Sequence, residues 1–206
     1  MVQKKETKPR GRPRAYDSAV VLNAVLNTFW EKGYAATSVD DLCRATGLNK
    51  PSLYAAWGDK HGLYLHALDA YIARVGQGMA AALADVSGGV RPALDRVLGQ
   101  AVSLYQSGRG CFLVTTAPAV AWDDEVVRQR VQQALLAQDH LLAQAFERAE
   151  QAGQRRLGPP VAMGAAVSAI LHSLAVRARA GASTDALQAW ASAALDALLG
   201  RESLSR

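Results

Sequence analysis

Groups suited to nucleic-acid contacts are concentrated in residues 46–54, which read Thr-Gly-Leu-Asn-Lys-Pro-Ser-Leu-Tyr. The Lys50 ammonium and the Tyr54 hydroxyl suit phosphate oxygens, which position a protein on DNA without reading its sequence. Ser52 can hydrogen-bond to base edges, and Pro51 can contact thymine methyl groups. This combination predicts a surface where contacts to the DNA backbone and to bases lie close together.

The spacing within the same stretch predicts a turn followed by a helix. Gly47 reaches positive φ at no steric cost, which suits a tight turn between helices, and Asn49 can cap the helix that follows. Pro51 falls in the first turn of that helix, where its missing N–H costs nothing. Leu53 and Trp57, four residues apart, share the inward face. We therefore expect the second helix of a helix-turn-helix, of the kind that enters a major groove.

Positive charge is concentrated in residues 1–14, which hold six lysines and arginines against one glutamate. Their net charge of +5 equals the formal charge of the whole chain, so the remaining residues sum to zero. The Arg-Gly-Arg-Pro sequence within this arm resembles the core of an AT-hook, which inserts guanidinium groups into a narrow A·T-rich minor groove. We expect Arg10, Arg12 and Arg14 to add affinity for DNA. The alternative is a solvated arm that only improves solubility.

Two cysteines, Cys43 and Cys111, stand apart without the spacing of a disulfide framework or a metal site. Cys43 is most simply a buried packing residue. Cys111 follows Gly108-Arg109-Gly110 and can begin a helix, where the helix dipole and Arg109 would favour the thiolate. It is a candidate for oxidation or alkylation, and the alternative is a small hydrophobic residue that opens a core helix. The histidines also lack metal-ligand spacing, and we expect neither a metal nor a cofactor.

Apolar residues recur at helical spacing along the chain, and no long stretch alternates as a strand does. The composition, dominated by Ala, Leu and Val, also favours an all-α protein. Capping residues and breaks predict the helices in order. The first four are expected from Asp17 to Gly33, over 39–46 with Thr37 or Ser38 as its cap, directly after Asn49, and over about 60–84. The later ones are expected to begin at Val90 and at 123–125, and to span about 161–180 and 184–199. An apolar segment lies at 111–120.

Spaced motifs in residues 15–68 resemble the N-terminal domain of the TetR family of repressors. They are Phe29-Trp30-Glu31-Lys32-Gly33-Tyr34, Thr37-Ser38-Val39, Asp41-Leu42, Gly47-Leu48, Lys50-Pro51-Ser52-Leu53-Tyr54 and Asp59-Lys60. Trp57 stands where Phe is usual and Asn49 where Ser is common, and both keep the physical role. The resemblance implies a nine-helix all-α fold. Its parts would be a basic arm (1–14), a three-helix DNA-binding domain (15–60) and an effector-binding and dimerisation domain (61–206).

With this resemblance, the candidate residues fall into three sets. The DNA-binding set comprises the three arm arginines with Thr37, Ser38, Asn49, Lys50, Pro51, Ser52, Tyr54 and Lys60. The effector set comprises the candidate sensor Cys111 and the possible pocket linings Tyr105, Phe112, Thr115, Trp122 and His140. A homodimer would use the last two helices through Ala166, Ile170, Leu187, Trp190, Leu195 and Leu198.

We therefore expect a ligand- or redox-responsive transcriptional repressor that binds a palindromic double-stranded operator as a homodimer. An unidentified small molecule or cysteine modification would release it. The alternative is an effector-independent nucleoid or architectural DNA-binding protein. An enzyme is not expected, because the chain lacks a nucleophile–base–acid signature and a phosphate-binding glycine loop. Apolar stretches are expected to break before about 18 residues and no apolar core follows the basic start, so we expect a cytoplasmic protein without a membrane span.

Overall fold

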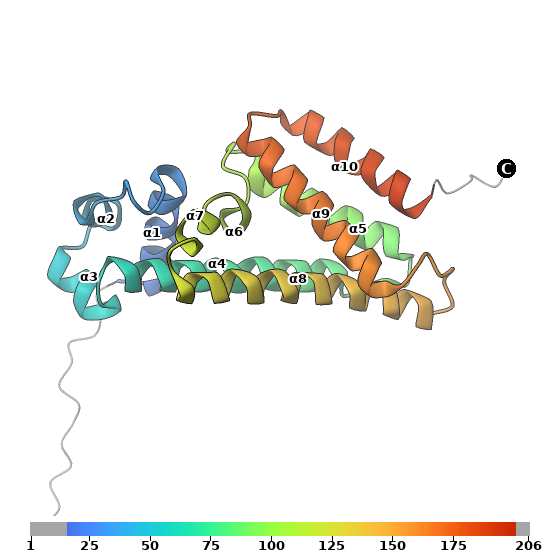
Figure 1. Cartoon of the computed structure of the whole chain (residues 1–206), viewed down its shortest axis with the longest axis horizontal. Coiled ribbons are helices and arrows are strands. Elements are labelled where there is room, and N and C mark those ends of the chain that lie inside the picture. The colour runs from blue at the N-terminus through green and yellow to red at the C-terminus, as the bar shows by residue number, and fades with distance from the viewer. Residues whose placement is uncertain (1–15, 201–206) are drawn as a thin grey trace, which may run out of the picture.

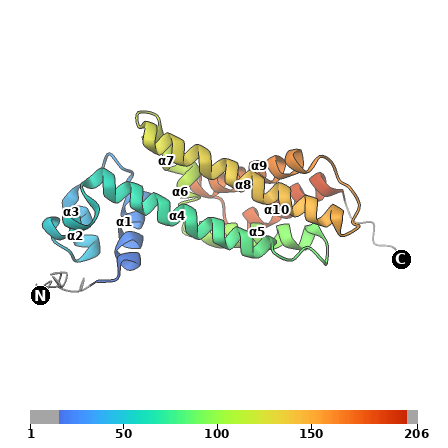
Figure 2. The ribbon, with the colours of Figure 1, turned by 90° about the horizontal axis from the view of Figure 1, so that it is seen from below.

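The computed structural model describes residues 16–200, which form ten helices and no strand (Figure 1). This confirms the expected all-α fold. The described chain is elongated in both views (Figures 1 and 2). Helices α1 (Ser18–Lys32), α2 (Val39–Thr46) and α3 (Lys50–Trp57) lie at one end, and α4 (Lys60–Leu83) extends from them along the molecule.

Each of the first three helices begins at a capping side chain that the sequence predicts. Asp17 accepts a hydrogen bond from the Ala19 N–H at 2.8 Å, and Asn49 accepts one from the Ser52 N–H at 2.9 Å. The cap of α2 is Ser38, whose Oγ accepts from the backbone N–H of the third helical residue. These bonds satisfy N–H groups that a first helical turn leaves free. Gly47 turns the chain from α2 to α3 at φ 68°, where glycine is unstrained.

The three short helices share one core with the start of α4. Phe29, Leu42, Leu53 and Leu63 come from α1, α2, α3 and α4 respectively, and all are fully buried. A helix as short as α2 or α3 is marginal alone in water, so its stability comes from packing this apolar face. The orientation of α3 is therefore fixed by α1 and α4.

The body of the molecule is built on α4 and the long helix α8 (Glu125–Gln151), which run side by side (Figure 2). Helices α5 (Val90–Tyr105) and α9 (Pro160–Arg179) pack against them, and α10 (Thr184–Leu199) packs against α5 and α9. Helix α9 approaches α8 closely at Gly164, where a Cβ would lie 2.8 Å from both the Ala143 nitrogen and the Asp139 carbonyl oxygen. A side chain there would force the two helices apart.

The described residues contain one more helix than the nine expected. The apolar segment 111–120 is divided into α6 (Phe112–Thr115) and α7 (Ala117–Ala121). The break falls at Thr116, whose φ of −126° is not helical, and Pro118 lies in the first turn of α7. Proline cannot donate the backbone hydrogen bond that a continuous helix would need there.

The expectation that every apolar stretch is interrupted before about 18 residues is wrong for α9. This helix has 20 residues and a mean hydropathy of 1.5 over its most apolar window, enough by length and composition to cross a membrane. It nevertheless packs against α5, α8 and α10, with Val167, Leu174 and Ala175 fully buried. This is the behaviour of a core helix, which can be apolar on several faces.

Candidate DNA-binding and sensor sites

The outer part of α3 carries the groups expected to contact DNA. Lys50 and Pro51 are exposed, and Ser52 and Tyr54 are half-buried. The Lys50 ammonium lies 5.3 Å from the centre of the Tyr54 ring, so both groups occupy one edge of the helix. A cation and a hydroxyl at this spacing can bind neighbouring phosphate oxygens.

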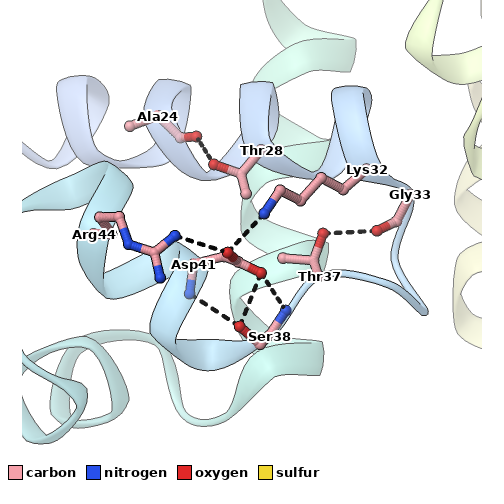
Figure 3. A network of polar contacts seen from close by, with 8 residues as sticks. All are labelled: Ala24, Thr28, Lys32, Gly33, Thr37, Ser38, Asp41 and Arg44. Carbon is pink, nitrogen blue, oxygen red and sulfur yellow. Dashed lines mark hydrogen bonds and ion pairs between the residues drawn. The ribbon is translucent and has the colours of Figure 1, made fainter.

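A network centred on Asp41 joins α1 to α2 (Figure 3). The carboxylate accepts from Lys32 Nζ at 2.6 Å, from an Arg44 nitrogen at 3.1 Å and from the Ser38 N–H at 3.0 Å. The Ser38 hydroxyl also donates to Asp41 at 2.8 Å and accepts from its backbone N–H at 3.1 Å. The Lys32 bond, followed by those from Ser38, holds the pKa of Asp41 well below its usual range. The sequence predicts the cap, but not the two cations gathered on this carboxylate.

Two of the expected DNA-contacting residues serve local structure. Thr37 is only 1% exposed, and its hydroxyl donates to the Gly33 carbonyl at 2.7 Å, so it stabilises the turn between α1 and α2 instead of facing DNA. Lys60 is half-buried with its ammonium 4.4 Å from the centre of the Tyr34 ring, and burial lowers its pKa. Ser38 and Asn49 stay at the surface as caps. Arg10, Arg12 and Arg14 lie outside the described residues.

The start of α4 is also tied to the start of α8. The His61 Nε2 lies 2.6 Å from the Asp124 carboxylate, which caps α8 by accepting from the Val127 N–H at 3.0 Å. That backbone bond is the main cause of the lowered pKa of Asp124, with His61 contributing further. His61, in the first turn of α4 directly after α3, is thus joined to the start of the long helix α8.

Cys111 is buried among tyrosines. Its Sγ lies 3.1 Å from the Tyr71 hydroxyl, which accepts a hydrogen bond from the Phe112 N–H at 3.3 Å. Because that N–H occupies the phenol oxygen, the phenol proton is free to point at sulfur. Burial, with Cys111 next in importance, raises the pKa of both Tyr71 and Tyr105, so both phenols remain protonated donors.

The expected support of Cys111 by Arg109 is wrong. Cys111 does precede a helix, but α6 is only four residues long, and the Arg109 side chain points towards α1. Its guanidinium bonds Asn27 and stacks on Trp30. The polar group that contacts the Cys111 sulfur is therefore the Tyr71 hydroxyl, not the Arg109 guanidinium.

Cys111 borders a partly open cavity of about 290 Å³ that is lined by residues of α4, α5, α6, α8 and α9. The residues around it are mainly apolar, and polar groups are contributed by Tyr71, Arg74, Gln100, Tyr105, Gln138 and His172. Gln138 Nε2 lies 3.2 Å from His172 Nε2 and donates to Ser168 Oγ at 3.1 Å. Burial lowers the pKa of His172, which favours its neutral form at pH 7. An apolar cavity with a few fixed polar groups is typical of a small-molecule site.

The structure brings only part of the expected effector set to this cavity. Cys111 and Tyr105 border it, whereas Phe112 is fully buried in an aromatic cluster with Trp30, Tyr64 and Tyr71. The Thr115 hydroxyl donates to the Cys111 carbonyl at 2.7 Å. Trp122 is 82% exposed, and His140 is exposed beside Gln144, so neither lies at the cavity.

Sequence reasoning did not identify Tyr71, Gln138 or His172 as part of this site. A signal existed for Tyr71, because it continues the buried stripe of α4 through Tyr64, Ala67 and Leu68 at helical spacing. Gln138 and His172 carry no such signal, since their meeting depends on how α8 crosses α9.

The expected dimer residues also divide by burial. Leu187 and Leu195 are 2% and 0% exposed within the subunit, so their side chains are not available to a second copy. Ala166, Ile170, Trp190 and Leu198 remain partly accessible on α9 and α10. The Arg177 guanidinium lies 4.7 Å from the centre of the Trp190 ring, which joins the accessible faces of the two helices.

Comparison with known proteins agrees with this arrangement. The family described as "Bacterial regulatory proteins, tetR family" matches residues 21–67, from α1 into α4. The transcriptional repressor ComR of Escherichia coli (strain K12) is 29% identical over 187 residues, covering 87% of this chain and 88% of ComR. The repressor BdcR of the same strain is 37% identical over 114 residues, covering 54% of this chain and 56% of BdcR.

A solved structure extends the likeness to the whole fold. The TetR family regulator CifR, a cysteine mutant in complex with 26-base-pair operator DNA, is 28% identical with a TM-score of 0.77. The alignment covers 90% of this chain and 99% of that one. The sequence motifs, the capped α2–turn–α3 unit and the architecture of the body therefore all agree with those of TetR family regulators. Residues 21–67 thus match the DNA-binding domain of the TetR family, with α2 and α3 as its helix-turn-helix, and the whole chain has the fold of a TetR family regulator.

Proposed function

We propose that this protein is a transcriptional repressor that binds operator DNA and is released when its sensor cavity is occupied or Cys111 is modified. The observation that carries the DNA-binding part is the edge of α3, where Lys50, Ser52 and Tyr54 project from a helix anchored by Leu53 and Trp57. The names of ComR and BdcR as repressors and the operator complex of CifR support the same function.

The contacts would divide by chemistry. Lys50 and Tyr54 would hold phosphates, Ser52 and Pro51 would meet base edges, and the caps Ser38 and Asn49 would place backbone N–H groups near the DNA. Arg10, Arg12 and Arg14 would follow the adjacent minor groove. The division into an arm (1–14), a DNA-binding domain (15–60) and an effector and dimerisation domain (61–206) follows from these roles.

A homodimer would give the operator its symmetry. Ala166, Ile170, Trp190 and Leu198 leave an apolar face of α9 and α10 partly accessible, and small residues on α9 allow close approach of another helix. Two copies related by a two-fold axis would present two α3 helices to equivalent half-sites. The operator would then be a palindrome, and the protein would act in the cytoplasm, where the DNA lies.

The effector step would take place at Cys111 and its cavity. Peroxide would transfer one oxygen atom to the thiol, giving a sulfenic acid and water. A quinone would instead take up the thiol across a ring C=C bond, forming an S–C bond and keeping the thiol proton, so that the ring becomes a hydroquinone. Either product would enlarge the side chain and disturb the Tyr71 hydrogen bond. The mainly apolar lining would favour uncharged reagents over ions.

A gel-shift titration of DNA from the protein's own promoter tests this proposal. Wild-type protein should form a discrete complex that peroxide, hypochlorite or a quinone dissociates, while Cys111→Ser should bind equally well and stay bound. Release of both proteins to the same extent would remove Cys111 from the sensing step. Binding to any DNA without preference, unchanged by every reagent, would favour the alternative of an architectural protein.

A further inference from the structure

Residue Arg109 attaches the loop before Cys111 to the DNA-binding helices. Its guanidinium donates to Asn27 Oδ1 at 3.0 Å, stacks on the Trp30 ring at 4.7 Å and lies 3.6 Å from Glu31. Its carbonyl accepts a hydrogen bond from Trp30 Nε1 at 3.2 Å. All three partners belong to α1, so backbone and side chain of one loop residue both bind the same helix.

The other end of the loop is fixed to the body. Gly110 has φ 66°, and a Cβ at this position would lie 2.4 Å from the Ala175 carbonyl oxygen of α9. The Thr115 hydroxyl donates to both the Arg109 and the Cys111 carbonyls, at 3.1 and 2.7 Å. The loop therefore cannot retreat towards α9, and its two carbonyls are held together as one unit.

A second route joins Cys111 to the same tryptophan. The Tyr71 hydroxyl contacts the Cys111 sulfur, and the Tyr71 ring packs edge-on against Trp30 with centroids 5.2 Å apart. Trp30 is only 2% exposed and contacts both Arg109 and Tyr71. A change at the sulfur can thus reach one buried side chain of α1 along both routes. Packed interiors pass on such displacements because they contain little free volume.

We propose that Arg109 and Trp30 couple the sensor cavity to α1, so that a group added to Cys111 moves the DNA-binding helices through this contact. This inference rests on the proposed release of DNA by Cys111 modification and names the contact that transmits it. Such a contact contributes a coupling free energy between two sites, which in proteins typically changes affinity about 5- to 150-fold. The physical requirement is a continuous set of contacts, and the loop at 109–111 supplies it.

The experiment measures modification and DNA affinity separately. In a Cys43→Ser background Cys111 is the only cysteine. The Cys111 thiol adds across the C=C double bond of N-ethylmaleimide. The sulfur forms an S–C bond, the thiol proton goes to the neighbouring carbon, and no group leaves. Intact mass gives the extent of alkylation, and fluorescence anisotropy with operator DNA gives the dissociation constant before and after. The ratio of the two constants is the coupling factor.

The Cys43→Ser parent should lose at least about tenfold in operator affinity on alkylation. Arg109→Ala should be alkylated to the same extent and lose less than about threefold. Trp30→Phe, which keeps an aromatic ring but is smaller and lacks the Nε1–H donor, gives a second test should Arg109→Ala fold poorly. Arg96→Ala is the matched control, because the Arg96 guanidinium also joins its helix to a neighbouring segment, here through the Ala82 and Asp85 carbonyls, but away from α1.

Three results are decisive. Alkylated Arg109→Ala and Trp30→Phe that retain DNA, with the parent and Arg96→Ala releasing it, establish the coupling contact. Equal release by all four proteins overturns the coupling contact and leaves Cys111 as the sensor. A parent that resists alkylation, or is alkylated and still binds DNA, overturns the proposed sensing function itself, and the coupling with it.

Discussion

In the helix-turn-helix, the side chains that pack in the core and those available for contact with DNA stand at different positions, often next to each other in the sequence. Leu53 is buried while its neighbour Ser52 faces outwards, and Thr37 is buried while its neighbour Ser38 is exposed. A single substitution on the outer edge can therefore change DNA binding without unfolding the domain. Lys50 is the residue best suited to that test, since its ammonium contacts only the Tyr54 ring among the interactions described above.

Replacing Lys50 by Ala should weaken binding to all DNA by a similar factor, because a phosphate contact carries no sequence information. The slope of log affinity against log salt should become shallower by about one per half-site. Anisotropy titrations at several salt concentrations, with operator and unrelated DNA, measure both effects. Ser52→Ala is the comparison, and it should lose affinity mainly for the operator. An unchanged slope for Lys50→Ala would mean that Lys50 does not contact phosphate.

At this scale the sequence predicts what is local. Asp17, Ser38 and Asn49 are capping residues in the structure, as their types and positions predict. The direction of Arg109 was not predictable, because it depends on Asn27 and Trp30 of α1, some 80 residues earlier in the chain. The residues that line the cavity could not be predicted for the same reason, since they come from five helices.

Between elements, the carboxylate of Asp41 holds α1 against α2. Its folded-state pKa is lower than that of an unfolded aspartate, about 3.9. A lowered pKa stabilises the fold above the unfolded value, and the stabilisation is lost as the pH falls towards the folded value. The capped start of α2 and its contact with α1 should therefore weaken in acid, below about pH 4.

Asp41→Asn should lower the melting temperature at pH 7 by on the order of a few °C, because the amide keeps the size but loses the charge that binds Lys32 and Arg44. At pH 3 the difference from wild type should shrink, since Asp41 of the unfolded wild-type chain is protonated there and the stabilisation that comes from the lowered folded-state pKa is being lost. Circular dichroism melts at both pH values measure this. Asp40→Asn is the matched control in the same helical turn. A difference that persists unchanged at pH 3 would exclude the charge as its cause.

The boundaries of the longer helices were also predictable from capping residues and glycines. α4, α8 and α10 begin at Asp59, Asp124 and Ser183, each of which accepts from a backbone N–H of the first turn. The separation of α6 from α7 was not foreseen, because the sequence gives Pro118 but not the non-helical Thr116 before it. The apolar length of α9 was underestimated, although the scarcity of charged residues in this segment is visible in the sequence.

For the whole molecule, the proposed homodimer determines how two copies of α3 would meet one operator. The face proposed for self-association is the accessible side of α9 and α10, around Ile170, Trp190 and Leu198. Half-buried apolar residues on adjacent helices are suited to an interface core, and a central aromatic often contributes strongly to binding.

Trp190→Glu should convert a dimer to a monomer and weaken operator binding by at least about 100-fold, because each monomer would hold only one half-site. Sedimentation velocity and anisotropy measure the two effects, and circular dichroism checks that the helices remain. Trp122→Glu makes the same change on a tryptophan that is 82% exposed and lies away from this face, and it should leave the dimer intact. A folded, dimeric Trp190→Glu protein would locate the interface elsewhere.

The apolar helix α9 also limits how the gene can be truncated. Helix α10 packs against α9 and α5 and contributes Leu187, Leu195 and Leu199 to their shared core. A premature stop codon before α10 would leave every DNA-contacting residue in place but uncover one of the most apolar helices of the chain. Exposed apolar surface of this kind promotes aggregation and attracts chaperones and proteases. Such an allele would behave as a null through loss of the protein from the cell, and the repressed genes would be expressed constitutively.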